Sequence, residues 1–271
     1  MNVSPKGFIY AIEGIATKRI LAFDQNGSFV RQSHYSNKEY GIGDYSFLSE
    51  QEIVARLNAS IKLSGKELKR KEYIAIINLN DYTTKIIEEG LEKDMTDFSS
   101  DFTNVLSTKE GRFVFGLSSQ KEYKLFFYDK NGTLIRNIVK EFEPVKMKGK
   151  KREEYEKLAD RRKNVQMKLG GSANTQIESE PYFYIIRRLT LDSYDNLWVF
   201  TSESQNEDML SVNLYDKQGN FIKAFYLENE ELGSQNLLRV VIRDNYLYAI
   251  VADKDNFEHI YTYSLPKEIC Q

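Results

Sequence analysis

Two adjacent arginines, Arg187 and Arg188, follow an aromatic run that begins at Tyr182. A guanidinium presents five N–H donors in a planar fork and also stacks on aromatic rings, so arginine beside tyrosine suits recognition of a carboxylate or a phosphate. In a strand, alternation places Tyr182, Tyr184 and Arg188 on one face and Arg187 on the other. We take these four residues as candidate ligand-binding residues. The alternative is that one arginine pairs with an acid of a neighbouring sheet.

The other reactive side chains do not form a catalytic pattern. His34 and His259 are the only histidines, and Cys270 is the only cysteine. A zinc site needs three or four ligands, and residues 253–258 lack the glycine and glutamate spacing of a calcium loop. We therefore expect no catalytic residue, no metal site and no cofactor. The near-balance of 38 basic and 40 acidic side chains also argues against a dedicated nucleic-acid binder.

A second candidate surface lies in a basic segment, residues 146–168, which carries 10 basic and 4 acidic side chains. Its apolar residues recur at helical spacing, which predicts a solvated helix within an insertion at 141–181. Concentrated positive charge also suits docking to an anionic surface. The residues that would serve this second interpretation are Lys148, Lys150, Lys151, Arg152, Arg161 and Arg162.

These candidates must be positioned by a repeated unit. Residues 19–31, 124–136 and 211–223 align without a gap: an apolar strand, then Asp-x-(Asn/Gln)-Gly, then a second apolar strand. Glycine supplies the positive φ of a tight hairpin turn, and the aspartate can accept backbone N–H bonds within it. Weaker copies at 74–87 and 259–266 extend the series. Most copies are roughly 50 residues apart, which is typical of a four-stranded propeller blade.

The sequence therefore predicts an all-β propeller of four-stranded antiparallel blades, with five units visible and one helical insertion. The expected units are 7–35, 58–89, 102–140, 182–227 and 237–266. The first unit lacks an innermost strand and the last an outermost one, so we expect a further blade before Met1. A five-bladed ring with one composite blade is the alternative. Ser49–Asn58 is expected to be a short helix, and Trp198 to pack between sheets.

The segment from Glu180 to Val199, with the hairpin after it, resembles the bacterial six-bladed β-propellers related to NHL repeats, as does the glycine-rich Tyr40–Tyr45. The resemblance implies six blades, but its motifs specify a fold rather than an activity. Our leading hypothesis for the function is a non-catalytic platform that binds a protein, peptide or glycan on one face. The resemblance also implies an exported, often lipid-anchored protein in the periplasm or at the cell surface. The N-terminus contains no signal peptide, so a cytoplasmic location stays open, and no apolar stretch is long enough to span a membrane.

An enzymatic alternative is a lactonase-like hydrolase or lyase with a calcium ion in its central channel. Its ligands would be carboxylates and amides near the ends of inner strands, namely Asn104, Asp192, Asp195 and Asp244. Aspartate and asparagine are also the residues expected in turns. We favour the turn interpretation, and with it the binding platform.

Overall fold

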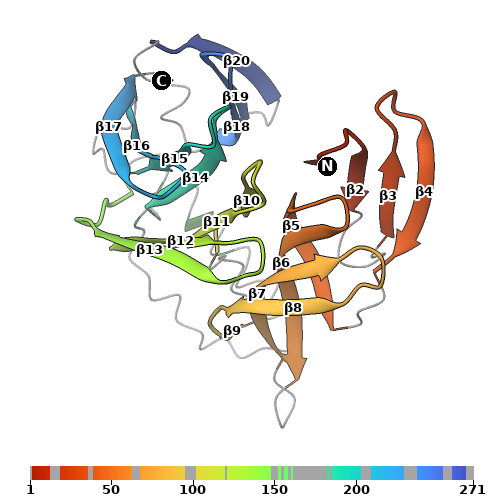
Figure 1. Cartoon of the computed structure of the whole chain (residues 1–271). Helices are drawn as coiled ribbons and strands as arrows, with labels where there is room; N and C mark the ends of the chain where they lie inside the picture. Colours follow the sequence, from red (N-terminus) through yellow and green to blue (C-terminus); the bar gives the residue numbers. More distant parts are fainter. Residues whose placement is uncertain are drawn as a thin grey trace.

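The computed structural model describes residues 2–12, 19–35, 39–62, 68–94, 102–119, 121–147, 185–202, 209–228, 237–252 and 258–266, with a few residues between 152 and 182. They form five antiparallel sheets, and the strands of each sheet pair in the order of the sequence. Figure 1 shows the sheets placed one after another along an arc, as propeller blades are. The prediction of an all-β propeller with four-stranded antiparallel blades is confirmed, with five blades. Six blades are not supported.

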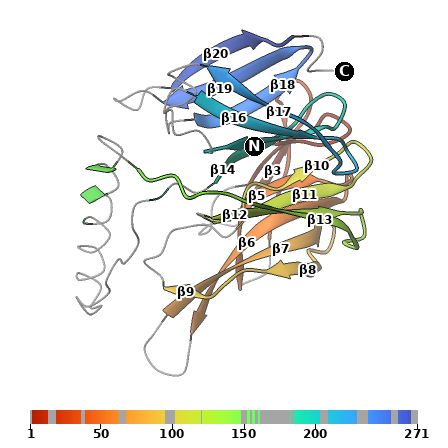
Figure 2. The same ribbon diagram turned by 90° about the vertical axis from the view of Figure 1, so that its left-hand side faces the viewer.

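Blade one contains β1 (Asn2–Val3), β2 (Ile9–Ile12), β3 (Arg19–Phe23) and β4 (Phe29–His34). Blade two contains β5 (Tyr40–Phe47), β6 (Glu52–Lys62), β7 (Leu68–Asn78), β8 (Thr84–Glu89) and the short β9 (Lys93–Asp94). β6 and β7 span 11 residues each, and Figure 2 shows them extending beyond the other blades to the point where β9 pairs with β7.

Blade three contains β10 (Leu106–Ser107), β11 (Phe113–Ser118), β12 (Glu122–Tyr128) and β13 (Leu134–Glu141). Blade four contains β14 (Ile186–Leu191), β15 (Leu197–Thr201), β16 (Met209–Tyr215) and β17 (Phe221–Glu228). In blade five the described strands are β18 (Leu237–Arg243), β19 (Tyr246–Ala252) and β20 (Glu258–Ser264).

Four apolar clusters hold the five blades together, one between each pair of successive blades. Ile20 of blade one and Leu57 of blade two belong to one of these clusters, and fully buried Trp198 of blade four and Leu247 of blade five belong to another. The prediction that Trp198 packs between sheets is confirmed. All five residues of β15 are buried, because neighbouring blades cover both faces of its sheet. This two-sided burial explains the continuous apolar runs in the central strands.

The repeated aspartates act as the sequence predicts. The Asp129 carboxylate accepts the backbone N–H groups of Asn131 and Thr133 at 2.9 and 2.8 Å. Asp24 and Asp216 make the same two bonds in their own turns. The glycine that follows each aspartate has a φ of 78–82°. The repeat therefore encodes one hairpin turn, used in three blades.

Two expectations about the strands fail. Blade one has its innermost strand, because β1 pairs with β2 through Asn2 and Tyr10. Ser49–Asn58 is not a helix, since most of it belongs to β6, where Ile53, Val54 and Leu57 are all buried. Burial on both faces of a sheet yields an apolar run that helical spacing imitates.

The helical insertion is not supported either. Most of 141–181 lies outside the described residues, and no helix with defined bounds occurs in the part that the structure describes. No helix within the described residues is long and apolar enough to cross a membrane.

Candidate functional site

The innermost strands of successive blades lie beside one another: β5 contacts β1 and β10, and β14 contacts β10 and β18. Three of them carry the same irregularity. The pairing register shifts between Ile42 and Asp44 in β5, between Ile186 and Arg188 in β14, and between Leu237 and Arg239 in β18. A β-bulge re-aims the side chain next to it. The residue after each bulge is charged: Asp44, Arg188 and Arg239.

In blades two and three, a polar side chain in or just before the innermost strand bonds to the backbone of the next blade. The Asp44 carboxylate accepts the Val105 N–H at 3.0 Å. One blade on, the Asn104 amide donates to the Leu189 carbonyl at 3.0 Å and accepts the Leu189 N–H at 3.3 Å. Arginine has no acceptor atom. Arg188 and Arg239, which take the corresponding place in blades four and five, therefore cannot make the N–H-accepting bond that Asp44 and Asn104 make.

Arg188 instead interacts electrostatically with charged residues of other blades. Desolvation lowers the pKa of its guanidinium, the Asp44 carboxylate opposes that effect, and the cations Arg239 and Arg56 lower the pKa further. Arg56 lies in β6 directly opposite Asp44, and its guanidinium donates to the Phe102 carbonyl at 3.0 Å. The N–H of the same Phe102 donates to the buried Glu72 carboxylate at 3.5 Å, and Glu72 pairs with Arg70 at 2.7 Å, so acidic and basic groups alternate in this neighbourhood.

The structure separates the four predicted ligand-binding residues. β14 begins at Ile186, so Tyr182 lies outside the strand that was expected to carry it. Tyr182 instead forms an isolated bridge with Lys146, whose ammonium lies 5.5 Å from the centre of the tyrosine ring. Tyr184 lies outside the described residues. Arg187 is the inserted residue of the β14 bulge, and desolvation lowers the pKa of its guanidinium to about 10.

Sequence reasoning picked Arg188 but missed Arg56 and Arg239. Successive inner strands carry a polar or charged residue at equivalent positions, and this repetition could have identified Arg239. It becomes visible only when the strands are aligned by their bulges, and the bulges are not apparent from the sequence. Of the six basic residues proposed as an interaction surface, the structure describes Arg152 alone, which is exposed and forms an ion pair with Glu156 at 2.8 Å. Lys148, Lys150, Lys151, Arg161 and Arg162 lie outside the described residues.

The residues weighed as calcium ligands have other roles. Asp192 accepts the N–H groups of Tyr194 and Asn196 at 2.9 Å each, and Asp195 and Asp244 adopt the positive φ of turn residues. Asn104 bonds the backbone of blade four, as described above. Arginines near the centre of the ring repel a divalent cation. The calcium-dependent alternative therefore gains no support from this position.

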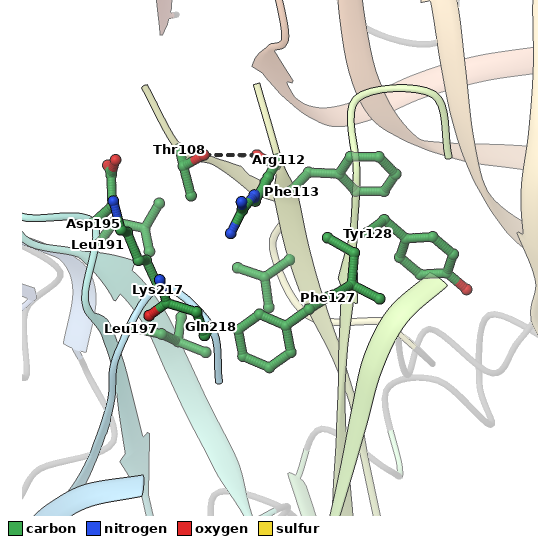
Figure 3. Close-up of a pocket in the computed structure, with 12 residues that line it drawn as sticks. Thr108, Arg112, Phe113, Phe127, Tyr128, Leu191, Asp195, Leu197, Lys217 and Gln218 are labelled. Carbon is green, nitrogen blue, oxygen red and sulfur yellow. Dashed lines mark hydrogen bonds between the residues drawn. The ribbon is translucent and has the colours of Figure 1, made fainter. Parts of the chain in front are cut away.

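A cleft of about 50 Å³ lies between the turns of blades three and four (Figure 3). Phe113, Phe127 and Leu197 contribute its apolar lining, and Lys217 and Asp195 contribute polar groups. Desolvation raises the pKa of the Asp195 carboxyl, which accepts the Lys109 N–H at 3.2 Å. Small-molecule sites usually enclose roughly 300–1,000 Å³, so this cleft is a seam between blades rather than a ligand pocket.

Beside these turns, the outer edge of the propeller carries a repeated pattern of exposed apolar residues. In blades one, three and four, the outermost strand begins with two exposed apolar residues. The first of each pair is Phe29, Leu134 or Phe221, with exposed fractions of 60%, 47% and 57%. The second residues are Val30, Ile135 and Ile222, and they are exposed as well. We call these six side chains the rim pairs.

No family model matches the chain, and no curated protein matches it. Among solved structures, a luciferin-regenerating enzyme is 13% identical over 96% of this chain and 74% of its own, with a TM-score of 0.44. A member of the DUF4221 family from Bacteroides vulgatus is 9% identical over 97% and 91%, with a TM-score of 0.36. A prolyl oligopeptidase B from Galerina marginata is 7% identical over 98% and 40%, with a TM-score of 0.41.

Proposed function

We propose that this propeller is a non-catalytic platform that binds a protein partner on the face formed by the Asp-x-(Asn/Gln)-Gly turns. The observation that carries the proposal is the repetition of the rim pairs. An exposed apolar side chain standing alone is ordinary, whereas grouped apolar surface marks sites of interaction. Here the same two positions are apolar and exposed in three blades, directly after the same turn.

The surroundings of the rim pairs suit an interface. Between blades three and four, Arg136 donates to the Asn220 side chain at 2.6 Å, and Lys217 pairs with Glu110 at 2.8 Å. Apolar contacts surrounded by polar groups are the usual composition of a protein–protein interface. Because the bonds join neighbouring blades, they also hold the rim pairs of those blades at a set spacing. A rigid surface loses little conformational entropy when it binds.

The chain offers a matched test. Val139 and Tyr226 are exposed to 52% and 55% and lie on the same strands as Leu134 and Phe221, further from the turns. The test compares three immobilised proteins: the wild type, Leu134→Ser/Phe221→Ser and Val139→Ser/Tyr226→Ser. Each would be incubated with an extract of the source organism, and the proteins bound to it would be fixed by chemical cross-linking. Bound proteins would be quantified by mass spectrometry, and unfolding midpoints would verify that all three proteins are folded.

We expect a set of proteins enriched by the wild type and by Val139→Ser/Tyr226→Ser, and lost from Leu134→Ser/Phe221→Ser. Equal retention of that set by both double variants would place the interface elsewhere and refute the proposal. The absence of any saturable partner of the wild type would refute it as well.

A further inference from the structure

The sequence contains two Asn-Gly pairs, and both lie in the repeated hairpin turn: Asn26-Gly27 in blade one and Asn131-Gly132 in blade three. Both asparagines are exposed. Asparagine is a thermolabile residue. Its side-chain amide is attacked most readily when glycine follows, because glycine has no Cβ to obstruct the approach of its backbone nitrogen. Each pair is therefore a potential site of deamidation.

Deamidation at such a pair needs only solvent water. The Gly27 nitrogen forms a bond to Asn26 Cγ, the bond from Cγ to the side-chain nitrogen breaks, and ammonia leaves with the proton of the Gly27 N–H. Water then opens the cyclic imide at either carbonyl carbon, which yields aspartate or isoaspartate. The peptide group between the two residues has to rotate first, so the hydrogen bond from the Gly27 N–H to the Asp24 carbonyl, at 3.0 Å, is broken.

In blade three, contacts with blade two hold this peptide group in place. The Lys85 ammonium of β8 donates to the Asn131 carbonyl at 2.6 Å. A Cβ on Gly132 would clash with Ile87 Cδ1, so this glycine is packed closely against Ile87. Rotation of the Asn131-Gly132 peptide group therefore breaks a bond to another blade and meets one of its side chains, in addition to breaking the bond within the turn.

In blade one, the same peptide group has more room. A Cβ on Gly27 would meet nothing within 4 Å, and no side chain of another blade bonds to Asn26 among the described residues. Gln25 donates to the Lys6 carbonyl at 2.9 Å, but that bond does not involve the Asn26-Gly27 peptide group. The free energy of a local opening adds to the barrier of any reaction that requires it. The turn of blade one therefore reaches the reactive geometry at lower cost.

We propose that Asn26 is the site at which this protein deamidates spontaneously, and that Lys85 and Ile87 protect Asn131. The change adds a carboxylate to a turn that already contains Asp24, directly before the rim pair of blade one. It therefore places negative charge beside exposed apolar side chains.

The corresponding pair in blade four, Gln218-Gly219, is resistant for other reasons. A glutamine side chain is one carbon longer, so it forms a larger ring and reacts more slowly. Gly219 is also buried, and a Cβ on it would lie 3.0 Å from a ring carbon of Phe127. The three turns thus provide one reactive site and two internal references in the same chain.

Peptide mapping by mass spectrometry tests the assignment. The full chain would be incubated at mildly alkaline pH, and conversion of amide to acid would be followed at Asn26, Asn131 and Gln218. We expect conversion at Asn26 to be at least about tenfold faster than at Asn131, and conversion at Gln218 to be the slowest. In concentrated urea the two asparagines should convert at similar rates, because both unfolded segments have the sequence Asp-x-Asn-Gly. Equal rates in the folded protein, faster conversion at Asn131, or an Asn26 that stays intact would overturn the proposal.

The protection by blade two has its own test. Lys85→Met changes an exposed side chain and removes the bond to Asn131, so conversion at Asn131 should rise by about threefold or more while that at Asn26 stays unchanged. Lys130→Met is the matched control, because it removes the charge of the exposed lysine next to Asn131 and leaves the Lys85 bond in place. Equal rates at Asn131 in the two variants would refute the protection by Lys85.

The reactivity of Asn26 does not depend on the binding platform. Leu134→Ser/Phe221→Ser should deamidate at Asn26 as the wild type does, because the two substituted residues belong to blades three and four. Failure of one proposal therefore leaves the other standing.

Discussion

The indole N–H of Trp198 donates a hydrogen bond of 3.1 Å to the carboxylate of Asp192. The same carboxylate accepts the N–H groups of Tyr194 and Asn196 and the side-chain amide of Asn196. The Asp192 carboxylate thus holds the turn between β14 and β15 and also satisfies the indole N–H of the only tryptophan, which is fully buried between blades four and five.

This relationship predicts that Asp192→Ala destabilises the protein by about 2–4 kcal/mol, since the turn loses its acceptor and a buried indole N–H is left without a partner. Asp216→Ala is the matched control, because Asp216 makes the equivalent turn bonds to Gln218 and Asn220 and none to an indole. Urea unfolding followed by tryptophan fluorescence would measure both. Equal destabilisation by the two substitutions would contradict the role given to the indole bond.

Asn104 joins blade three to blade four through both backbone groups of Leu189. Asn104→Ala should cost about 1–3 kcal/mol, because it leaves a buried N–H and a buried carbonyl without partners. Hydrogen exchange would localise the effect: the Leu189 amide should exchange faster in the variant, while the Phe200 amide changes only with global stability. Unchanged exchange at Leu189 would show that the bond does not hold the strand.

Two glycines of the repeated turn differ only in their surroundings. Gly27 and Gly132 have φ values of 82° and 78°, but a Cβ on Gly27 would meet nothing within 4 Å, whereas one on Gly132 would clash with Ile87 Cδ1. Gly27→Ala should cost about 1–2 kcal/mol for the left-handed backbone. Gly132→Ala should cost about 1–3 kcal/mol more, because Ile87 must move.

Thermal unfolding of the two alanine variants would measure this difference. Ile87→Val, which lacks Cδ1, should recover part of the extra cost in the double variant with Gly132→Ala. No recovery would mean that the crowding does not come from Ile87.

The turn carboxylate of Asp129 should give a pH-dependent contribution to stability. The hydrogen bond from the Thr133 N–H is the main reason that the pKa of Asp129 lies below its usual value. A depressed carboxyl pKa stabilises the fold above the unfolded pKa of about 3.9, and this stabilisation is lost as the pH falls through the folded pKa. The stability gap between the wild type and Asp129→Asn should therefore be constant near neutral pH and shrink below about pH 4.

Asn78 provides the control for that titration. It occupies the same turn position in blade two and accepts the Asn80 N–H at 2.8 Å with an amide that does not titrate. The stability gap between the wild type and Asn78→Ala should stay flat over the same pH range in urea titrations. A gap for Asp129→Asn that is equally flat would contradict the assignment.

The repeat was readable from the sequence because it depends on local chemistry. An aspartate that accepts the N–H groups of its own turn and a glycine that tolerates positive φ work within five residues, so their spacing alone predicts hairpins. β6 was not readable in the same way. Its residues are buried by two neighbouring blades, and apolar residues at positions such as Ile53, Val54 and Leu57 suit a helix face as well as a strand covered on both sides.

The sequence by itself therefore determined the class of fold and the hairpin turns, and it picked out Arg188 as a candidate ligand-binding residue. Only the tertiary structure decided the number of blades, the presence of an innermost strand in blade one, and which charged residues act on Arg188. Arg56, Arg188 and Arg239 come from three separate blades, and bulges that depend on strand pairing set the direction of two of them. Pairing between strands is a long-range property of the chain, so no local pattern shows that Arg56 and Arg239 influence the charge of Arg188.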